Sequence, residues 1–259
     1  MPQTHRLIQG DMPLVVTAIH DGHALRPAAA EIMALSDAER LREEDPFTAG
    51  WTTIADNRLI GSQSRFEVDL NRPREKAVYI QPEDAWGLHV WKKTPAPQLI
   101  AGSLAVYDAF YNNAFRLFTA LENRFNHFVV FDLHTYNHRR EGPDAPPAEA
   151  AGNPEVNLGT GTMDRDKWAP IIDRFQADLS AFDFGGRQLD VRENIKFFGG
   201  QFGSWTHENF PDSGCVISIE FKKFFMDEWT GIPDVTQLAA IRQSLQSTMP
   251  GVLAALKTI

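Results

Sequence analysis

The sequence has very little cysteine: Cys215 is the single one among 259 residues. One thiol cannot form a disulfide within the chain, and it excludes a zinc site built from several cysteines. The chain also lacks any run of the roughly 20 apolar residues that a membrane-spanning helix needs. Its first residues, MPQTHRLIQGDMP, lack the apolar centre of a secretory signal peptide. We therefore expect a cytoplasmic protein with no membrane partner, whose metal ligands, if it binds a metal, are histidines and carboxylates.

Positive charge is also scarce. Lys and Arg number 25 against 34 Asp and Glu, so the formal net charge is −9. Binding of nucleic acid without sequence preference rests on clustered Lys and Arg, so we expect no nucleic-acid partner. Apolar residues make up 43% of the chain and charged residues 23%, which is typical of globular proteins and argues against general disorder. The length is at the upper end for one domain.

Three short apolar runs have the β-branched content of strands buried on both faces of a sheet. They cover residues 13–19, 127–133 and 215–221. A fourth segment, residues 65–70 (RFEVDL), alternates apolar with polar side chains, as a half-buried strand does. The sequence therefore predicts four strands at separate places along the chain.

Four other segments carry apolar residues at helical spacing. They are residues 28–44, 101–124, 166–183 and 236–259. Pro250 is expected to break or restart the last of these helices. Apolar strands that alternate with helices predict an α/β fold, with a mixed, largely parallel sheet flanked by helices. No shift in composition marks a boundary, so we expect one domain over residues 1–259.

Residues 141–161 are rich in Pro, Ala and Gly and have no periodicity. This composition predicts a long loop inserted within the domain. Loops of that length in compact domains are usually functional or mobile.

Polar side chains follow the apolar runs at the places where the strands should end. His20 and His23 follow the first run, His134 follows the second, and Glu220 lies near the end of the third. In an open α/β sheet, ligands bind outside the carboxyl ends of the strands. A catalytic zinc ion takes three protein ligands and leaves a position for water. The three strand ends could therefore hold Zn²⁺ and supply a base.

A possible anion-binding site follows residues 65–70. Asn71 and Arg72 stand side by side before Pro73. A guanidinium group binds two carboxylate oxygens at once, and an amide donates a further hydrogen bond. The sequence Asn-Arg-Pro is also typical of a turn, and a rigid turn could hold these two side chains in place to bind a carboxylate.

These segments are similar to motifs of known hydrolases. The segment 69–72 (DLNR) resembles the Asp-x-Asn-Arg motif of zinc metallocarboxypeptidases and aspartoacylases, and 132–136 (DLHTY) resembles their element with the third zinc ligand. The fullest likeness is to the N-formylglutamate amidohydrolase family. That family shares both segments, the early His-x-Gly at 20–22 and a late Glu followed by Met-Asp-Glu at 226–228. The resemblance spans residues 20–228.

The resemblance implies a zinc-dependent enzyme that hydrolyses N-formyl-glutamate or a related small N-acyl amino acid. It implies a fold of the zinc-exopeptidase type, in the phosphorylase/hydrolase-like class. His20 and His134 match zinc ligands. The remaining ligand is open: His23 stands where metallocarboxypeptidases have a glutamate, and imidazole can replace a carboxylate on zinc. Asp45 or Glu44 could serve instead. We favour His23, with Asp45 as the alternative.

The resemblance also implies roles for residues around the metal. Asp69 matches a carboxylate that accepts a hydrogen bond from the first histidine and fixes its tautomer. Arg65 resembles the arginine that polarises the scissile carbonyl. Asn71 and Arg72 would hold the α-carboxylate of the substrate. Glu220 matches the glutamate that acts as general base and then as acid.

A glutamate substrate has a second carboxylate, which needs another cation. Arg139, Arg140, Arg165 and Lys222 are candidates from the sequence. His207 precedes the third apolar run in a Gly-rich stretch, and we expect it to line the substrate pocket.

Two other functions use the same residues. A carboxypeptidase-like exopeptidase would need the same zinc and arginines in a larger cleft. A non-enzymatic binding protein could keep the fold, but it has no need for Glu220, Arg65 and Arg72 together.

Overall fold

Seven strands form one sheet in the computed structural model, which describes residues 4–259. The strands are β1 (His5–Ile8), β2 (Leu14–Ala18), β3 (Asn57–Gly61), β4 (Phe128–Tyr136), β5 (Val156–Gly159), β6 (Val191–Glu193) and β7 (Gly214–Lys222). Their order across the sheet is β1-β3-β2-β4-β7-β5-β6. The pairs β3-β2, β2-β4, β4-β7 and β5-β6 are parallel, and the pairs β1-β3 and β5-β7 are antiparallel. The sheet is therefore mixed and largely parallel.

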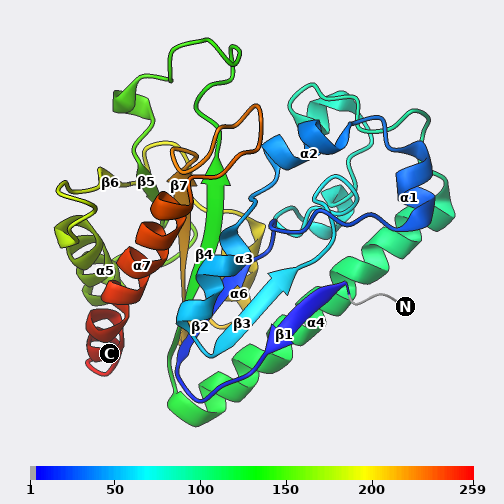
Figure 1. The fold of residues 1–259 in the computed structure, drawn as a ribbon. Helices are drawn as coiled ribbons and strands as arrows, with labels where there is room; N and C mark the ends of the chain where they lie inside the picture. Colours follow the sequence, from blue (N-terminus) through cyan, green and yellow to red (C-terminus); the bar gives the residue numbers. More distant parts are fainter. Residues whose placement is uncertain (1–3) are drawn as a thin grey trace.

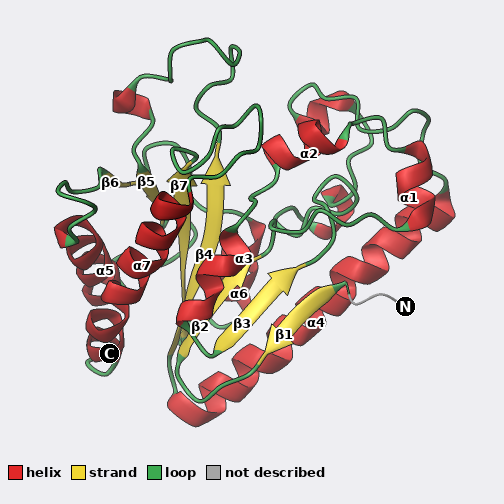
Figure 2. Ribbon diagram, viewed as in Figure 1, coloured by secondary structure: helices red, strands yellow, loops and turns green. Residues whose placement is uncertain are grey.

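Helices cover both faces of this sheet (Figures 1 and 2). The α-helices of residues 4–259 are α1 (Pro27–Ile32), α2 (Asp37–Glu43), α3 (Thr48–Trp51), α4 (Pro97–Phe125), α5 (Ala169–Ala181), α6 (Gln201–Asn209) and α7 (Val235–Leu256). Helices α3, α5 and α7 pack on one face, and α4 and α6 pack on the other. This arrangement is a single α/β domain.

The central strands are buried on both faces because side chains of a strand alternate between them. In β2, Leu14 and Val16 join the core under α5 and α7, while Val15 joins the core under α4. In β4, Phe131 joins the core under α5 and α7, and Val130 joins the core under α4. All five side chains are buried, so both strands need apolar residues at successive positions.

The three apolar runs were predicted as strands, and they form β2, β4 and β7. The prediction for residues 65–70 was wrong: this segment is a series of turns. Its apolar side chains are buried, but in two different cores, Phe66 in one and Val68 with Leu70 in the other. The alternation therefore reflects burial between two clusters and not a strand.

The helix predicted over residues 28–44 is two helices, α1 and α2. Ser36 interrupts it: its hydroxyl accepts a hydrogen bond from the N–H of Glu39, whose carboxylate accepts from the N–H of Ser36. This capping box starts a new helix. The expectation that Pro250 would break the last helix was also wrong, since α7 continues through it.

The predicted loop at residues 141–161 contains the short strand β5 near its end. Strands β1, β3 and β6 were missed as well, and each has only three to five residues. Such short segments have too few positions to display a period.

Parallel pairing brings the carboxyl ends of β2, β3, β4 and β7 to one edge of the sheet. In the register of β4 and β7, His134 lies opposite Glu220. His20 follows β2 directly. These side chains come from distant parts of the sequence, and the sheet gathers them at the edge where ligands bind in such folds.

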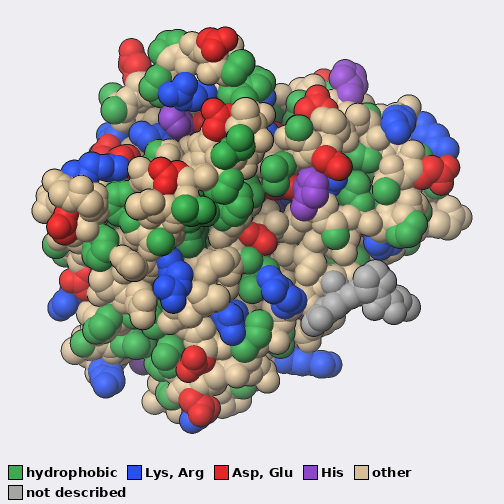
Figure 3. Space-filling model, viewed as in Figure 1, with side chains coloured by type: hydrophobic (Ala, Val, Ile, Leu, Met, Phe, Trp, Pro, Cys, Tyr) green, Lys and Arg blue, Asp and Glu red, His purple; other side chains and the backbone are tan. Residues whose placement is uncertain are grey.

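The surface seen in Figure 3 mixes acidic, basic and apolar side chains, without one large patch of a single charge. None of the helices in residues 4–259 combines the length and apolar character that crossing a membrane requires.

Candidate active site

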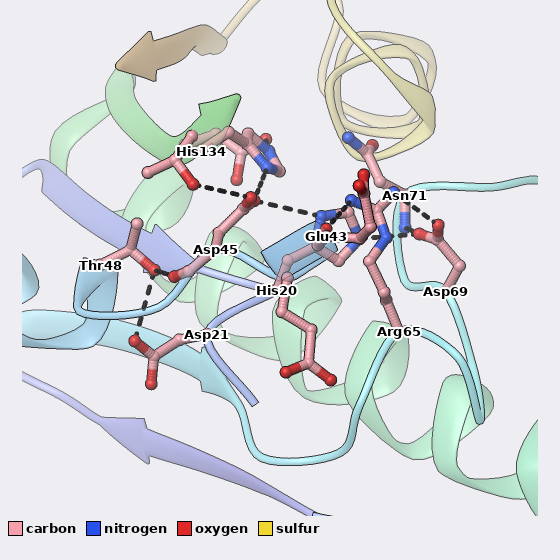
Figure 4. A network of polar contacts seen from close by, with 12 residues as sticks. His20, Asp21, Glu43, Asp45, Thr48, Arg65, Asp69, Asn71 and His134 are labelled. Atoms are coloured by element: carbon pink, nitrogen blue, oxygen red, sulfur yellow. Dashed lines mark hydrogen bonds and ion pairs between the residues drawn. The ribbon is translucent and has the colours of Figure 1, made fainter. Parts of the chain in front are cut away.

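Three buried side chains meet at this edge of the sheet: His20, Asp45 and His134. Figure 4 shows Asp45 between the two imidazole rings. Its Oδ2 lies 3.0 Å from Nδ1 of His134 and 3.4 Å from Nδ1 of His20. One donor atom from each residue lies within 4.8 Å of the other two. Two imidazole nitrogens and a carboxylate are a ligand set that zinc accepts.

The far side of each imidazole faces a second buried carboxylate. Nε2 of His20 lies 2.7 Å from Oδ1 of Asp69, and Nε2 of His134 lies 2.9 Å from Oδ2 of Asp132. An ionised carboxylate only accepts hydrogen bonds, so each Nε2 carries the hydrogen. Both Nδ1 atoms then present a lone pair toward the Asp45 carboxylate. Two such acceptors repel each other unless a cation or a proton lies between them.

Two observations show that the cluster fits a metal ion. Nδ1 of His20 is buried and has no hydrogen-bond partner within residues 4–259. The pKa of His134 is also affected: burial would lower it, but Asp132 and Asp45 raise it well above its usual range. Positive charge at the centre is therefore favoured, and a divalent cation supplies it while satisfying both nitrogens.

Asp45 lies in the turn between α2 and α3, and its neighbours hold it in place. Its N–H donates to the carbonyl of His20 at 3.0 Å, and Oγ1 of Thr135 donates to its Oδ1 at 3.0 Å. Burial would raise the pKa of Asp45, but its interactions with His134 and His20 outweigh burial and hold that pKa well below its usual range.

His23 is not part of this cluster. Its side chain is 39% exposed, and its Nδ1 lies 2.5 Å from Oε2 of Glu44, outside the metal cluster. The backbone explains why: a Cβ at Gly22 would lie 2.4 Å from the backbone of Ser62, so the chain runs tightly along the end of β3 and carries His23 away. Asp45, the alternative from the sequence, takes the third position instead.

Asp69 connects the cluster to Arg65. Its Oδ2 accepts hydrogen bonds from the Arg65 guanidinium at 2.8 Å and from the hydroxyl of Tyr79. Burial would raise the pKa of Asp69, but Arg65 and His20 hold it well below its usual range. The guanidinium of Arg65 also stacks on Trp86, 4.9 Å from the ring centre. Arg65 is thus fixed beside His20.

The cluster opens into a cavity of about 250 Å³. Arg65, Asn71, Arg72 and Glu220 line it together with the two histidines and Asp45. The sheet edge therefore brings most of the site residues predicted from the sequence into one pocket.

Glu220 directs its carboxyl group into this pocket. Within residues 4–259, no hydrogen bond or ion pair engages that carboxyl group. Burial raises the pKa of Glu220 to about 8, with Asp45 and Asp132 adding to the rise while His134 opposes it. A carboxyl group with such a pKa can hold and release a proton near neutral pH.

Asn71 and Arg72 form another wall of the pocket. Oδ1 of Asn71 accepts a hydrogen bond from the N–H of Phe202 at 2.9 Å, at the start of α6. A Cβ at Gly200 would lie 2.4 Å from the Asn71 amide, so this close approach requires glycine. The Arg72 guanidinium makes no ion pair with residues 4–259. It is a cation available to an anionic ligand.

The comparisons with known proteins agree with this geometry. The family model of N-formylglutamate amidohydrolase matches residues 12–225. The chain belongs to this family. No curated protein matches it in a sequence comparison.

Two solved structures have the fold of this family member. A crystal structure of N-formylglutamate amidohydrolase from Ralstonia eutropha JMP134 is 16% identical, with a TM-score of 0.71, over 97% of this chain and 96% of that one. A gene product from Agrobacterium tumefaciens has the same identity and TM-score, over 98% of this chain and 96% of that one. Amide-bond hydrolysis is the chemistry of the family, and the site has the groups for it.

The cations predicted for a second substrate carboxylate have different surroundings in this family member. Arg140 lines the pocket, where its guanidinium pairs with the carboxylate of Glu43 at 3.1 and 3.3 Å. Arg165 pairs with Glu193 and Asp173. Lys222 donates to a backbone carbonyl, and Arg139 lies outside the lining of this pocket.

His207 lies on α6 away from the metal cluster. Its Nε2 accepts a hydrogen bond from the N–H of Val216 at 3.1 Å, and its ring lines a separate pocket beside Trp168. Desolvation lowers the pKa of His207 to about 4. The structure thus does not bring His207 to the pocket that sequence reasoning assigned to it, because α6 turns this side chain toward β7.

Sequence reasoning gave no role to Asp132 or Lys223. For Asp132 a signal was present: it stands two residues before His134 on one strand, and such residues share a face. Lys223 lines the pocket beside Asp45. Its position directly after a buried strand gave no indication in the sequence of which groups its side chain would contact.

Proposed function

We propose that this chain is a zinc-dependent amidohydrolase that converts N-formyl-L-glutamate and water to formate and L-glutamate. The observation that carries the proposal is the shared pocket: His20, Asp45 and His134 meet there with Glu220 and with the unpaired guanidinium of Arg72. Membership of the N-formylglutamate amidohydrolase family supports the choice of substrate.

The metal ligands in this proposal are Nδ1 of His20, Nδ1 of His134 and the carboxylate of Asp45. When bound there, zinc supplies Lewis acidity, which polarises a carbonyl group and makes a water molecule more acidic. Asp69 and Asp132 keep the hydrogens on the outer ring nitrogens, so the inner nitrogens stay free for the metal.

The substrate is held by its α-carboxylate. Arg72 offers two parallel N–H donors, and Nδ2 of Asn71 offers another. Because Oδ1 of Asn71 is engaged with Phe202, the amide is oriented with its NH₂ group free. Holding the α-carboxylate here places the neighbouring amide bond at the metal cluster. The small size of the cavity, about 250 Å³, favours a short acyl group over a long peptide.

Glu220 moves the proton. It takes a proton from the attacking water as the C–O bond forms, and it gives that proton to the amide nitrogen as the C–N bond breaks. Arg65 donates to the oxygen of the formyl group as negative charge builds on it. Loss of one such donor typically costs about 2.7–4 kcal/mol in the transition state.

The γ-carboxylate of glutamate would bind Arg140. The Arg140 side chain is 52% exposed, and its ion pair with Glu43 is longer than the best charge-assisted hydrogen bonds. The Glu43 side chain is only 10% exposed, so a substrate carboxylate competes with Glu43 for Arg140 or binds the free donors of its guanidinium beside it.

The test is a metal analysis followed by a substrate comparison. Purified protein is expected to hold one zinc ion and to release formate from N-formyl-L-glutamate faster than acetate from N-acetyl-L-glutamate. Preferred release of the C-terminal residue of a dipeptide would favour an exopeptidase. Zinc-loaded protein that binds these compounds and hydrolyses none would favour a binding protein.

A further inference from the structure

Lys223 is a buried cation in the wall of the pocket. It follows β7 directly, and its side chain is 1% exposed. No carboxylate lies within ion-pair distance of its ammonium group among residues 4–259. A buried charge without a counter-ion is costly unless other groups bind it, so its hydrogen bonds matter.

Two backbone carbonyls bind this ammonium group. Nζ of Lys223 donates to the carbonyl of Arg42 and, at 2.8 Å, to the carbonyl of Glu44. Both carbonyls lie at the C-terminal end of α2, where the last carbonyls of a helix lack partners within the helix. The helix dipole also favours a cation at that end. The ammonium group therefore clamps the end of α2.

The residue after this clamp is Asp45. The N–H of Asp45, which belongs to the same peptide group as the Glu44 carbonyl, donates to the carbonyl of His20 just after β2. Thr48 also donates to the Asp45 carbonyl at 2.7 Å. None of these bonds fixes the segment before Asp45 relative to β7. Lys223 does, and it stands three residues after Glu220.

We infer that Lys223 is a positioning residue of the metal centre, whose ammonium group clamps the carbonyls of Arg42 and Glu44 and so holds Asp45 against His20 and His134. The inference rests on the proposed metal site. It assigns Lys223 no contact with the substrate and no part in proton transfer.

The variant Lys223→Met keeps the length of the side chain and removes the ammonium group. Both carbonyls then lose their donor, and Asp45 gains freedom. We expect the dissociation constant for Zn²⁺ to rise about 10–100-fold, as for loss of other groups that orient ligands. At saturating zinc, KM should stay within about twofold of the unaltered protein and kcat should recover.

The matched control is Lys222→Met. Lys222 is the neighbouring lysine, and its Nζ donates to the carbonyl of Asn153 at 3.0 Å, away from Asp45. Its removal should leave zinc affinity unchanged. Affinities are measured by competition with a chromogenic chelator, and circular dichroism checks that the metal-free variants are folded.

Zinc affinity unchanged in folded Lys223→Met would overturn the inference. So would a raised KM with unchanged zinc affinity, since Lys223 would then bind substrate. If the Met variant does not fold, Lys223→Gln decides by the same measurement, because its amide can donate to one carbonyl and should give an intermediate loss. The chelator assay needs no substrate, so it remains decisive if N-formyl-L-glutamate proves not to be hydrolysed. Unaltered protein that binds no zinc would overturn the metal site and this inference together.

Discussion

At the scale of single residues, each carboxylate of the site has a distinct environment. Asp45 lies between two imidazole rings, and Asp69 accepts from Arg65, Tyr79 and His20. Both are held ionised. For Glu220, burial together with the charges of Asp45 and Asp132 outweighs the opposing effect of His134 and raises its pKa to about 8. In the proposed mechanism, these environments separate a metal ligand, an orienting group and a proton carrier, although all three are carboxyl groups.

The role of Glu220 gives the first prediction. In Glu220→Gln, the amide keeps the size of the side chain but cannot accept the proton of the attacking water. We expect kcat for formate release to fall at least about 100-fold. Zinc content should remain at the level of the unaltered protein, because Glu220 is not a proposed ligand. Full activity in the variant would assign the base elsewhere.

His207 gives a prediction on pH. Its Nε2 accepts from the N–H of Val216, so the folded protein needs a neutral ring, with a pKa near 4. In the unfolded chain, histidine has its ordinary pKa of about 6.5. The stabilisation is therefore complete above about pH 6.5 and is lost as the pH falls toward 4, by at most about 3 kcal/mol.

The variant His207→Gln tests this. Its amide oxygen can still accept from Val216 but does not titrate. Urea unfolding at several pH values should show a smaller loss of the free energy of unfolding between pH 6.5 and 4 than in the unaltered protein. Parallel pH curves would show that His207 does not titrate as described. Formate release at neutral pH should be unaffected.

At the scale of elements, the site depends on segments that belong to no regular element. The turn after α2 carries Asp45, and the turns at residues 65–72 carry Arg65, Asn71 and Arg72. The loop after β4 is held by Glu228, whose carboxylate accepts from the N–H groups of His138 and Arg139. This contact gives Glu228, the last residue of the Met-Asp-Glu segment at 226–228, a structural role. It also places Arg140 opposite α2.

The pair between Arg140 and Glu43 therefore joins the loop after β4 to α2, and it gives a prediction on specificity. In Arg140→Gln, KM for N-formyl-L-glutamate should rise about 10-fold, because the γ-carboxylate loses its cation. KM for N-formyl-L-glutamine should change little. Steady-state kinetics with both substrates measures the difference.

Arg139→Gln is the control, since Arg139 belongs to the same loop but lies outside the lining of the pocket. An equal rise of KM for both substrates in Arg140→Gln would show that the pair only shapes the loop. In that case another group binds the γ-carboxylate.

At the scale of the whole molecule, the proposed metal centre joins two parts of the chain. His20 and His134 extend from the sheet, whereas Asp45 comes from the segment between α2 and α3. Zinc bound to all three, as proposed, would stabilise the folded state and not the unfolded one. At zinc concentrations about 1,000 times the dissociation constant, this adds about 4 kcal/mol, or a rise in Tm of about 10 °C for a chain of this size.

Thermal melting with and without zinc measures this effect. Asp45→Ala should lose most of the zinc-dependent rise in Tm, whereas His23→Ala should keep it, because His23 lies outside the cluster. The opposite outcome would return His23 to the ligand set.

The sequence by itself determined the class of fold and most of the site. A strand buried on both faces of a sheet needs a run of apolar residues, so β2, β4 and β7 could be recognised in the sequence. The positions of His20, His134 and Glu220 at the ends of these strands could then be recognised too. The segment at residues 69–72 was visible as well, since an Asn-Arg pair is a local pattern. Each of these signals is carried by neighbours in the chain.

Only the tertiary structure decided the third position of the cluster and the groups that support it. The sequence favoured His23 over Asp45 as the third ligand, but the choice depends on how the chain runs past β3 at Gly22 and Ser62. Lys223 reaches the carbonyl of Glu44, 179 positions away in the sequence. Contacts over such separations depend on packing and not on local pattern. For the same reason, His23 is partly exposed and lies outside the cluster, whereas His20 and His134 are buried members of it.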